Sequence, residues 1–221
     1  MDTYEAVTSR RAVRKFTDEP VPMDTIKRVL EAARWAPSGS NLQPWHIYVV
    51  TGEPLARLKK IATERVAAGD PWDEREYVMY PEDMKPLYVE RRNAFGRDRY
   101  SALGIVKDDW GARQRAAIAN WDCFGAPVAL FCYIDRDLGY PQWSDLGMYL
   151  QSVMVLLRAE GLDSCPQMAW SQVRKTVADI VGPPDELMLF CGMSIGHADP
   201  AEVYVRNLRA PLDETVTFVE D

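Results

Sequence analysis

Two groups of side chains in this sequence are suited to binding a polar or anionic ligand, and the first is a cluster of arginines near the start. The segment Ser9-Arg-Arg-Ala-Val-Arg-Lys-Phe16 holds four cations within six residues. Arginine presents a planar guanidinium that matches the oxygens of a phosphate. A solvated basic face is the usual explanation of such a run. Because the chain carries a formal charge of −7, this concentration of cations also makes an anion site a candidate.

The second group is the polar loop 38–43, with the sequence Ser-Gly-Ser-Asn-Leu-Gln, which lies between Pro37 and Pro44. Each proline lacks a backbone donor and disfavours helical geometry in the residue before it, so both ends of the loop are rigid. The loop offers hydroxyls, carboxamides and backbone N–H groups to a polar ligand. Small polar residues are also ordinary turn residues, and the loop alone favours a simple turn from helix to strand.

A third pattern, Gly192-Met-Ser-Ile-Gly196, matches the nucleophile elbow of hydrolases, and an apolar run precedes it as that motif requires. An elbow must also open a helix, whereas the segment that follows is short and polar and contains Pro200. We therefore interpret Ser194 as a small residue at the end of a strand. The sequence has neither the P-loop pattern nor the glycine pattern of a dinucleotide-binding turn.

Composition limits the classes of partner. With 221 residues, of which 47% are apolar and 27% charged, we expect one domain spanning 1–221. The net negative charge and a pI near 5.0 argue against nucleic acid or an anionic membrane as the main partner. The first thirty residues lack the apolar core of a signal peptide and no run is long enough to span a bilayer, so we expect a cytoplasmic protein. Four separated cysteines and two histidines predict neither a disulfide framework nor a metal site.

The elements that must position these side chains follow from hydrophobic periodicity. Apolar residues at helical spacing predict helices at 4–10, 22–36, 54–66, 110–124 and 173–181, the last capped by Ser171. Aromatic, β-branched or continuous apolar runs predict strands at 45–51, 127–134 and 187–195.

The helix predicted at 142–160 is apolar on most of its sides. Such a helix must be buried on most sides, and a subunit interface is one way to bury it. We therefore predict a homodimer packed on this helix.

Three further segments have weaker patterns. The region 67–109 has poor periodicity, several helix-breaking residues and many aromatics, and we interpret it as an ordered lid. The stretch 161–170 is predicted to be a loop, beginning at a helix-capping glycine. The stretch 215–219 is predicted to be a late strand, which could pair in its own sheet or cross to a partner.

Taken together, these segments resemble the nitroreductase family of flavin enzymes. The resemblance extends in the family's order from residue 4 to about residue 211, and it rests on five pieces: Ser9-Arg-Arg-Ala-Val-Arg-Lys-Phe16, Ala36-Pro-Ser-Gly-Ser-Asn-Leu-Gln-Pro-Trp-His46, Asp145-Leu-Gly147, Gly161-Leu-Asp-Ser-Cys-Pro166 and Asn207-Leu-Arg-Ala-Pro211. It implies an α+β fold with a central, mainly antiparallel sheet flanked by helices, an interlocked homodimer, and FMN in two sites at the subunit interface.

The resemblance also implies which residues bind FMN. Arg10 and Arg209 resemble the phosphate clamps, with Arg206 as a second cation, and Arg14 resembles the side chain that faces the pyrimidine edge of the flavin. The segment from Pro37 resembles the one that reaches the flavin from the other subunit. The full set implied to contact FMN is Arg10, Arg11, Ala12, Arg14, Pro37, Ser38, Gly39, Asn41, Met168, Ala169, Arg206 and Arg209, where Met168 and Ala169 match the loop whose backbone lies beside the flavin N5.

Two positions depart from the family pattern. Ala12 stands where members commonly have serine, so it can offer only its backbone to the cofactor. Asn207 stands where many members have lysine, which lowers the charge around the phosphate unless Arg206 compensates.

The activity that the resemblance implies is ping-pong transfer of hydride from NADH or NADPH, through FMN, to a small nitroaromatic or quinone acceptor. The alternatives are a reductive dehalogenase or flavin dehydrogenase with the same fold and cofactor, or a non-catalytic flavin-binding dimer. We further hypothesise that the aromatic lid covers the flavin, and that Arg97 or Arg99 meets a carboxylated acceptor such as a nitrobenzoate.

Overall fold

The structure of the protein is a computed structural model. It describes residues 1–70 and 72–220. Among these residues one sheet is formed by β1 (His46–Thr51), β2 (Val128–Asp135), β3 (Asp163–Gln167) and β4 (Leu187–Gly196). The strand order is β1-β2-β4-β3, and every neighbouring pair is antiparallel. The expected antiparallel sheet of an α+β fold is confirmed, as are the three strands predicted from sequence.

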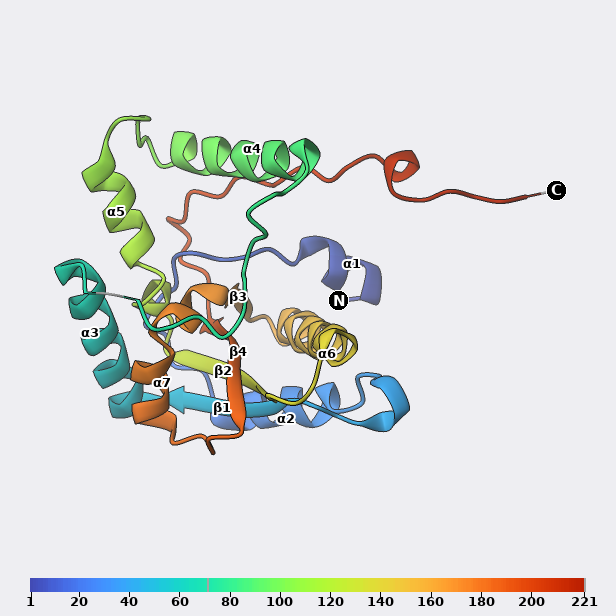
Figure 1. Cartoon of the computed structure of the whole chain (residues 1–221), viewed down its shortest axis with the longest axis horizontal. Coiled ribbons are helices and arrows are strands. Elements are labelled where there is room, and N and C mark those ends of the chain that lie inside the picture. The colour runs from blue at the N-terminus through green and yellow to red at the C-terminus, as the bar shows by residue number, and fades with distance from the viewer. Residues whose placement is uncertain (71, 221) are drawn as a thin grey trace.

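Helices cover both faces of this sheet (Figure 1). On one face lie α3 (Gly52–Ala68) and α7 (Arg174–Val181), and on the other lie α2 (Met23–Ala33) and α6 (Tyr140–Ala159). The short helix α1 (Thr3–Ser9) packs on α6. The remaining helices, α4 (Pro86–Ala102) and α5 (Trp110–Ile118), form an arm beside the sheet layers.

The central strand β2 shows why the sequence there is apolar without interruption. Ala129, Phe131 and Tyr133 belong to the core under α3 and α7. The intervening residues, including Leu130 and Ile134, belong to the core under α2 and α6. Because successive side chains point to opposite faces of a strand, two covered faces require apolar residues at every position.

Helix α6 is buried on most but not all sides within one chain. Leu146, Leu150 and Leu157 pack in the core. Met148, at 38% exposure, lies on the open side together with the exposed Gly147. The predicted helix is confirmed, and part of its apolar surface remains uncovered by its own chain.

The stretch 161–170 corrects a prediction, because Asp163–Gln167 forms strand β3 rather than a loop. Gly161 does end α6 with a left-handed φ of 76°. Proline cannot donate to a ladder, and β3 can include Pro166 because it is an edge strand, whose neighbour in the sheet is β4. The predicted cap at Ser171 is also wrong: α7 begins at Arg174, and the Ser171 hydroxyl donates to the Met168 carbonyl at 2.8 Å.

The region 67–109 is more regular than its periodicity indicated, because it contains the seventeen-residue helix α4. None of its residues is fully buried, so the helix needs no apolar stripe. Pro86 stands in its first turn, where proline suits a helix. Helix α5 likewise ends at Ile118, before the predicted residue 124.

The C-terminal segment also differs from its prediction. Within the part of the chain that the structure describes, 215–219 forms no strand, although its residues favour β-structure. It lies extended and projects away from the body, with no neighbouring strand from its own chain to pair with (Figure 1). The short 3-10 turn Leu212–Glu214 precedes it.

No helix among the described residues is both long and apolar enough to cross a membrane. The four cysteines are free and buried.

Candidate functional site

The arginine-rich segment after α1 is fixed by backbone hydrogen bonds to the edge strand β3 and to the short 3-10 turn Cys123–Gly125 that precedes β2. The N–H of Val13 donates to the carbonyl of Ser164 in β3 at 3.1 Å. The N–H of Phe16 donates to the carbonyl of Phe124 at 3.0 Å. Ala12 forms an isolated bridge with Ser164 as well. The segment therefore presents its side chains from a backbone that the sheet holds in place.

Four of the predicted arginines, Arg11 among them, line one cavity, although they come from the two ends of the chain. Arg10 lies at the end of α1, whereas Arg206 and Arg209 lie in the C-terminal segment, and all three line a cavity of about 380 Å³, which we name the clamp cavity. Arg206 donates to the carbonyl of Thr8 at 3.2 Å. Among the described residues, none of the three pairs with a carboxylate. The clamp cavity thus presents cationic groups without a protein counter-ion.

Arg11 is placed differently from Arg10. Its guanidinium forms an ion pair with Glu202, whose side chain is only 7% exposed. It also lies over the ring of Tyr204, 4.3 Å from the centroid. Arg11 borders the clamp cavity, but its charge is already neutralised by the protein.

Arg14 is held from its backbone and from its guanidinium. Its N–H donates to the second Glu202 oxygen at 2.5 Å, and its guanidinium donates to the Ala12 carbonyl at 3.2 Å. The guanidinium lies 5.4 Å from the centroid of the Phe95 ring on α4. The backbone carbonyl of Ala12 therefore helps to hold the Arg14 guanidinium.

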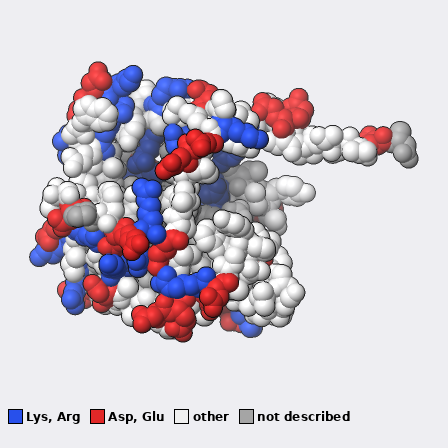
Figure 2. Space-filling view, in the orientation of Figure 1, with Lys and Arg blue, Asp and Glu red and all other residues white. Residues whose placement is uncertain are grey.

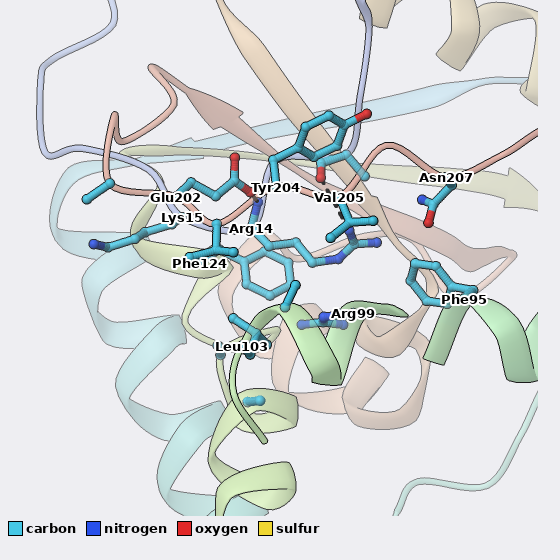
Figure 3. Close-up of a pocket in the computed structure, with 16 residues that line it drawn as sticks. Arg14, Lys15, Phe95, Arg99, Leu103, Phe124, Glu202, Tyr204, Val205 and Asn207 are labelled. Carbon is cyan, nitrogen blue, oxygen red and sulfur yellow. Dashed lines mark hydrogen bonds between the residues drawn. The ribbon is translucent and has the colours of Figure 1, made fainter. Parts of the chain in front are cut away.

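A second cavity, of about 260 Å³, lies between this segment, α4 and the C-terminal segment, and we name it the apolar cavity (Figure 3). It shares Ala12, Tyr204 and Asn207 with the clamp cavity, so the two are neighbours. Most of its remaining lining is apolar: Phe95, Ala102, Leu103, Ala116, Ala119, Phe124, Ala201, Val203 and Val205.

Cations of this cavity include Arg14 and Arg99, which extend toward the same space from the segment after α1 and from α4 (Figure 3). The pKa of Arg99 is held below its ordinary value, first because the side chain is buried and second because Arg14 is nearby. In the space-filling view, basic side chains are visible in the recess beneath α4 (Figure 2).

The predicted polar loop is tied to α6 and lies away from both cavities. The N–H of Gly39 donates to both carboxylate oxygens of the buried Asp145, each at 3.3 Å. Ser40 and Asn41 have φ values of 50° and 59°, a left-handed conformation that is uncommon for residues other than glycine. Helix α6 contacts both α1 and this loop, which lie on opposite sides of it (Figure 1). One chain does not bring Pro37, Ser38, Gly39 and Asn41 to the arginines.

Met168 and Ala169, which follow the end of β3, also lie outside the linings of the two cavities. Met168 is 38% exposed, and Ala169 packs against the core. Both are positioned by Gln167, whose side chain is buried. Its carbonyl oxygen accepts from the Ser194 hydroxyl at 2.5 Å, and its amide donates to the Asn120 carbonyl at 2.6 Å.

The same network confirms the interpretation of Ser194. Its side chain is fully buried within β4 and bonded to Gln167. The strand ends at Gly196 and no helix follows among the described residues up to 211. The geometry of a nucleophile elbow is therefore absent from this part of the structure.

Several lining residues were not identified from the sequence. Glu202 lies 191 positions from Arg11, and no local pattern indicates such a pair. Phe95 and Tyr204 belong to segments with weak periodicity, so their contribution depends on how those segments fold. In α4 the sequence indicated only that Arg97 or Arg99 could contact a ligand, and it did not show which of the two faces the cavity.

Comparison with known proteins gives consistent matches over almost the entire chain. The model of the Nitroreductase family matches residues 7–197. A protein of Pseudomonas putida named 4-nitrobenzoate reductase is 38% identical over 218 residues, which cover 98% of this chain and 94% of that protein. A protein of Ectopseudomonas oleovorans named nitrobenzene nitroreductase is 35% identical over 219 residues, 98% of this chain and 96% of its own. The crystal structure of the FMN and NADPH-dependent nitroreductase NfnB from Sphigopyxis sp. strain HMH superposes with a TM-score of 0.94 at 40% identity, with both chains covered completely.

Proposed function

The chain belongs to the nitroreductase family, and from that membership we propose that it is an FMN-dependent oxidoreductase that uses NAD(P)H to reduce nitroaromatic acceptors. The single observation that carries the proposal is the clamp cavity, where arginines from both ends of the chain meet without a protein counter-ion. Similarity to FMN- and NADPH-dependent relatives supports the same cofactor and reductant.

The side chains of the clamp cavity fit the phosphate of FMN. A phosphate monoester carries between one and two negative charges at neutral pH and accepts several hydrogen bonds. Arg10, Arg206 and Arg209 supply guanidinium donors to one cavity. Asn207 adds no charge, so Arg206 takes the place of the family's lysine in this proposal.

The rest of the site orients the ring of the cofactor. We assign Arg14 to the pyrimidine edge, where a positive charge favours the reduced, anionic flavin. The ring of Phe95 lies 5.4 Å from that guanidinium. Met168 and Ala169 are proposed to lie beside N5, on a backbone that the Gln167 network keeps rigid.

FMN, when bound, supplies the reversible acceptance of a hydride, which no protein side chain can supply. The protein binds and orients the two substrates. We propose that the nicotinamide and the acceptor occupy the same place in turn, in a ping-pong order. No side chain then needs to act as a nucleophile.

The segment 67–109 acts in this proposal as the cover of the site. Helix α4 forms one wall of the apolar cavity through Phe95, Arg99 and Leu103. It lies over the recess in the orientation of Figure 2. Such a wall excludes water from the reacting centre and contacts the acceptor.

We propose that the functional unit is a homodimer in which the loop 37–41 completes the site of the second subunit. Three features of the single chain support this: the loop lies away from its own arginines, α6 has an open apolar side, and the C-terminal segment is exposed and projects from the body. Light scattering at micromolar concentration should therefore give twice 25.1 kDa, and a monomer would refute the dimer.

Mixed dimers test the crossing of this loop. One chain carries Arg209→Gln, which removes one cation from its clamp cavity. The other chain carries Gly39→Asp, which places a second carboxylate against Asp145. If the loop acts across the interface, the mixed dimer keeps one complete site and binds one FMN. If the loop serves its own chain, the mixed dimer has no complete site and binds none.

The activity is tested by following NADPH and NADH oxidation by the purified protein with FMN, with and without a nitroarene. The proposal predicts oxidation that depends on FMN and accelerates when 4-nitrobenzoate or nitrobenzene is added. Halide release from a halogenated arene without nitroarene reduction would favour the dehalogenase alternative. Bound FMN without turnover of any acceptor would favour a non-catalytic flavin-binding dimer.

A further inference from the structure

A third cavity lies at the corner where α4 is joined to α5, and we name it the arm cavity. It has a volume of about 790 Å³, and its lining comes from α4, from the connecting loop and from the start of α5. Among the lining residues that the structure describes, none is a carboxylate and four are cations: Arg92, Arg97, Lys107 and Arg113. None of these lining residues also lines the clamp cavity or the apolar cavity. The arm cavity is therefore separate from the site proposed for FMN.

Most of these cations are not neutralised by the protein. Arg97 pairs with Glu90 at 2.8 Å, at a position where both side chains are mostly exposed. Over residues 1–70 and 72–220, the side chains of Arg92, Lys107 and Arg113 form neither an ion pair nor a hydrogen bond. Three positive charges around one cavity are therefore left for an external anion.

Arg113 is half-buried, and its side chain contacts aromatic rings. Its guanidinium carbon lies 4.7 Å from the centroid of the Tyr100 ring and 5.6 Å from that of the Trp110 ring. Such cation–π contacts offset part of the cost of burying the charge. The Nε atom is nevertheless buried with no hydrogen-bond acceptor among the described residues, and a buried polar group without a partner is costly. An anionic ligand at this guanidinium would reduce that cost.

The type and arrangement of the cations indicate phosphate as the anion. Arginine presents a planar fork of donors that matches phosphate oxygens, and lysine binds phosphate as a point charge. Arg92, Lys107 and Arg113 come from three consecutive segments of the arm, so a ligand that reaches all three needs more than one anionic group. A pyrophosphate has two linked phosphate groups and meets this need.

The size of the cavity and the rest of its lining indicate that the pyrophosphate belongs to a larger molecule. A volume of about 790 Å³ lies within the range of small-molecule sites and exceeds what a pyrophosphate alone would fill. Tyr100, Ile105 and Val106 add an aromatic ring and two aliphatic side chains to the lining. The base of a nucleotide can pack against such side chains without a specific hydrogen bond.

We infer that the arm cavity binds the pyrophosphate of a nucleotide, with Arg92, Lys107 and Arg113 as its cationic contacts. The inference goes beyond the proposed function, because this binding needs neither FMN nor turnover. Two sources share the chemistry: a free nucleoside diphosphate, and the dinucleotide that serves as reductant. The corner of α4 and α5 lies on the opposite side of the view from the loop 37–41 and the projecting C-terminal segment (Figure 1), so the proposed dimer interface does not include the cavity.

A matched control is Arg91, which precedes Arg92 on α4. It pairs with Glu214 at 3.0 Å and is absent from the lining of the arm cavity. Arg91→Gln therefore removes one positive charge from α4 without removing it from the cavity. Lys107→Gln and Arg113→Gln each remove one from the cavity itself. Because Lys107 is exposed, its replacement should leave folding intact.

The experiment measures the binding of ADP, AMP, adenosine and inorganic pyrophosphate by calorimetry, with FMN in excess so that the clamp cavity is occupied. ADP should bind about tenfold or more tightly than AMP, and adenosine should bind weakest. ADP should also bind more tightly than pyrophosphate, because the cavity accommodates the nucleoside. Lys107→Gln and Arg113→Gln should each weaken ADP binding by about tenfold, whereas Arg91→Gln should leave it within about twofold of wild type.

The KM for NADPH distinguishes the two sources of the pyrophosphate. If the reductant is the source, Lys107→Gln should raise the KM for NADPH by about the same factor as it weakens ADP binding, with the KM for nitrobenzene unchanged. If a free nucleotide is the source, Lys107→Gln should weaken ADP binding and leave both KM values as they are in the wild type.

Three results would overturn the inference. The first is that AMP or adenosine binds as tightly as ADP, and the second is that inorganic pyrophosphate does so. The third is that ADP binds equally to the wild type and to folded Lys107→Gln and Arg113→Gln. Lys107→Gln alone keeps the third test decisive if Arg113→Gln does not fold. A protein that reduced no nitroarene would contradict the proposed function and leave these binding measurements unaffected.

Discussion

Adjacent arginines at positions 10 and 11 should have separable roles, with Arg10 serving cofactor binding and Arg11 serving folding. Arg10 lies in the clamp cavity, and its contact with the protein is a weak one, 4.0 Å from the Met154 sulfur. Arg11 is neutralised by the nearly buried Glu202. Replacing each by glutamine keeps much of the side-chain length and removes the charge.

The expected magnitudes follow from these surroundings. Arg10→Gln removes a charge-assisted hydrogen bond to phosphate, about 1.5–3 kcal/mol, so FMN should bind roughly ten- to hundredfold more weakly. Arg11→Gln leaves the Glu202 carboxylate without its cation. Loss of one partner from a fully buried pair costs about 3–5 kcal/mol. Arg11 is 24% exposed, and Glu202 keeps its bond to the Arg14 N–H, so about 2 kcal/mol is expected here. For a chain of this length that lowers Tm by about 4–8 °C.

Two measurements on the apoprotein test this contrast. Quenching of flavin fluorescence during FMN titration gives the dissociation constant, and circular dichroism during heating gives Tm. Arg10→Gln should change the first and leave Tm within about 1 °C or 2 °C of wild type. The reasoning is refuted if Arg11→Gln weakens FMN binding as much as Arg10→Gln while leaving Tm unchanged.

Two further predictions concern stability. Gly192→Ala should destabilise the fold by about 1–3 kcal/mol in urea unfolding, because the added Cβ would lie 2.5 Å from Cδ1 of the buried Trp170; an unchanged midpoint would contradict the close packing. Burial by itself would raise the pKa of Asp73, but hydrogen bonds from Arg65 and from the N–H of Lys175 outweigh burial and hold that pKa below its ordinary value of 3.8. This stabilisation is complete above the ordinary pKa and is lost as pH falls through the lower folded value, so the stability difference between wild type and Asp73→Asn should shrink on acidification from pH 6 toward pH 3; a constant difference would show that the ionised carboxylate is not responsible.

The parts of the fold that the sequence predicted are those whose patterns reflect burial directly. Strands β2 and β4 are continuous apolar runs because helices cover both faces of the sheet. Helix α6 is apolar on most sides because it packs on several elements. In these cases a local pattern and its tertiary surroundings agree, so periodicity alone identifies the element.

The parts that the sequence did not predict depend on tertiary position. Strand β3 contains Pro166, which is acceptable only because β3 lies at the edge of the sheet. Helix α4 has no fully buried residue, so its sequence carries no apolar stripe from which a helix could be predicted. The segment 215–219 has strand-like residues but meets no neighbouring strand in its own chain.

The residues of the candidate site also divide into those that a local pattern identifies and those that depend on tertiary position. Arg10 and Arg11 could be identified because cations are conspicuous in an acidic chain, whereas the roles of Arg206 and Arg209 followed from the family resemblance. Their division into a neutralised Arg11 and an available Arg10 could not, since it depends on Glu202 at the other end of the sequence. Arg99 likewise differs from Arg97 only in which side of α4 faces the apolar cavity.

The most direct test of the central proposal is an absorption spectrum of the FMN-loaded protein during anaerobic addition of NADPH and then of a nitroarene. The proposal predicts a flavin absorption band at about 450 nm that bleaches when the reductant is added and returns when the nitroarene is added. Control samples without NADPH should keep the band throughout. A protein that binds no FMN, or whose bound FMN keeps its band in excess NADPH and NADH, would contradict the proposed function.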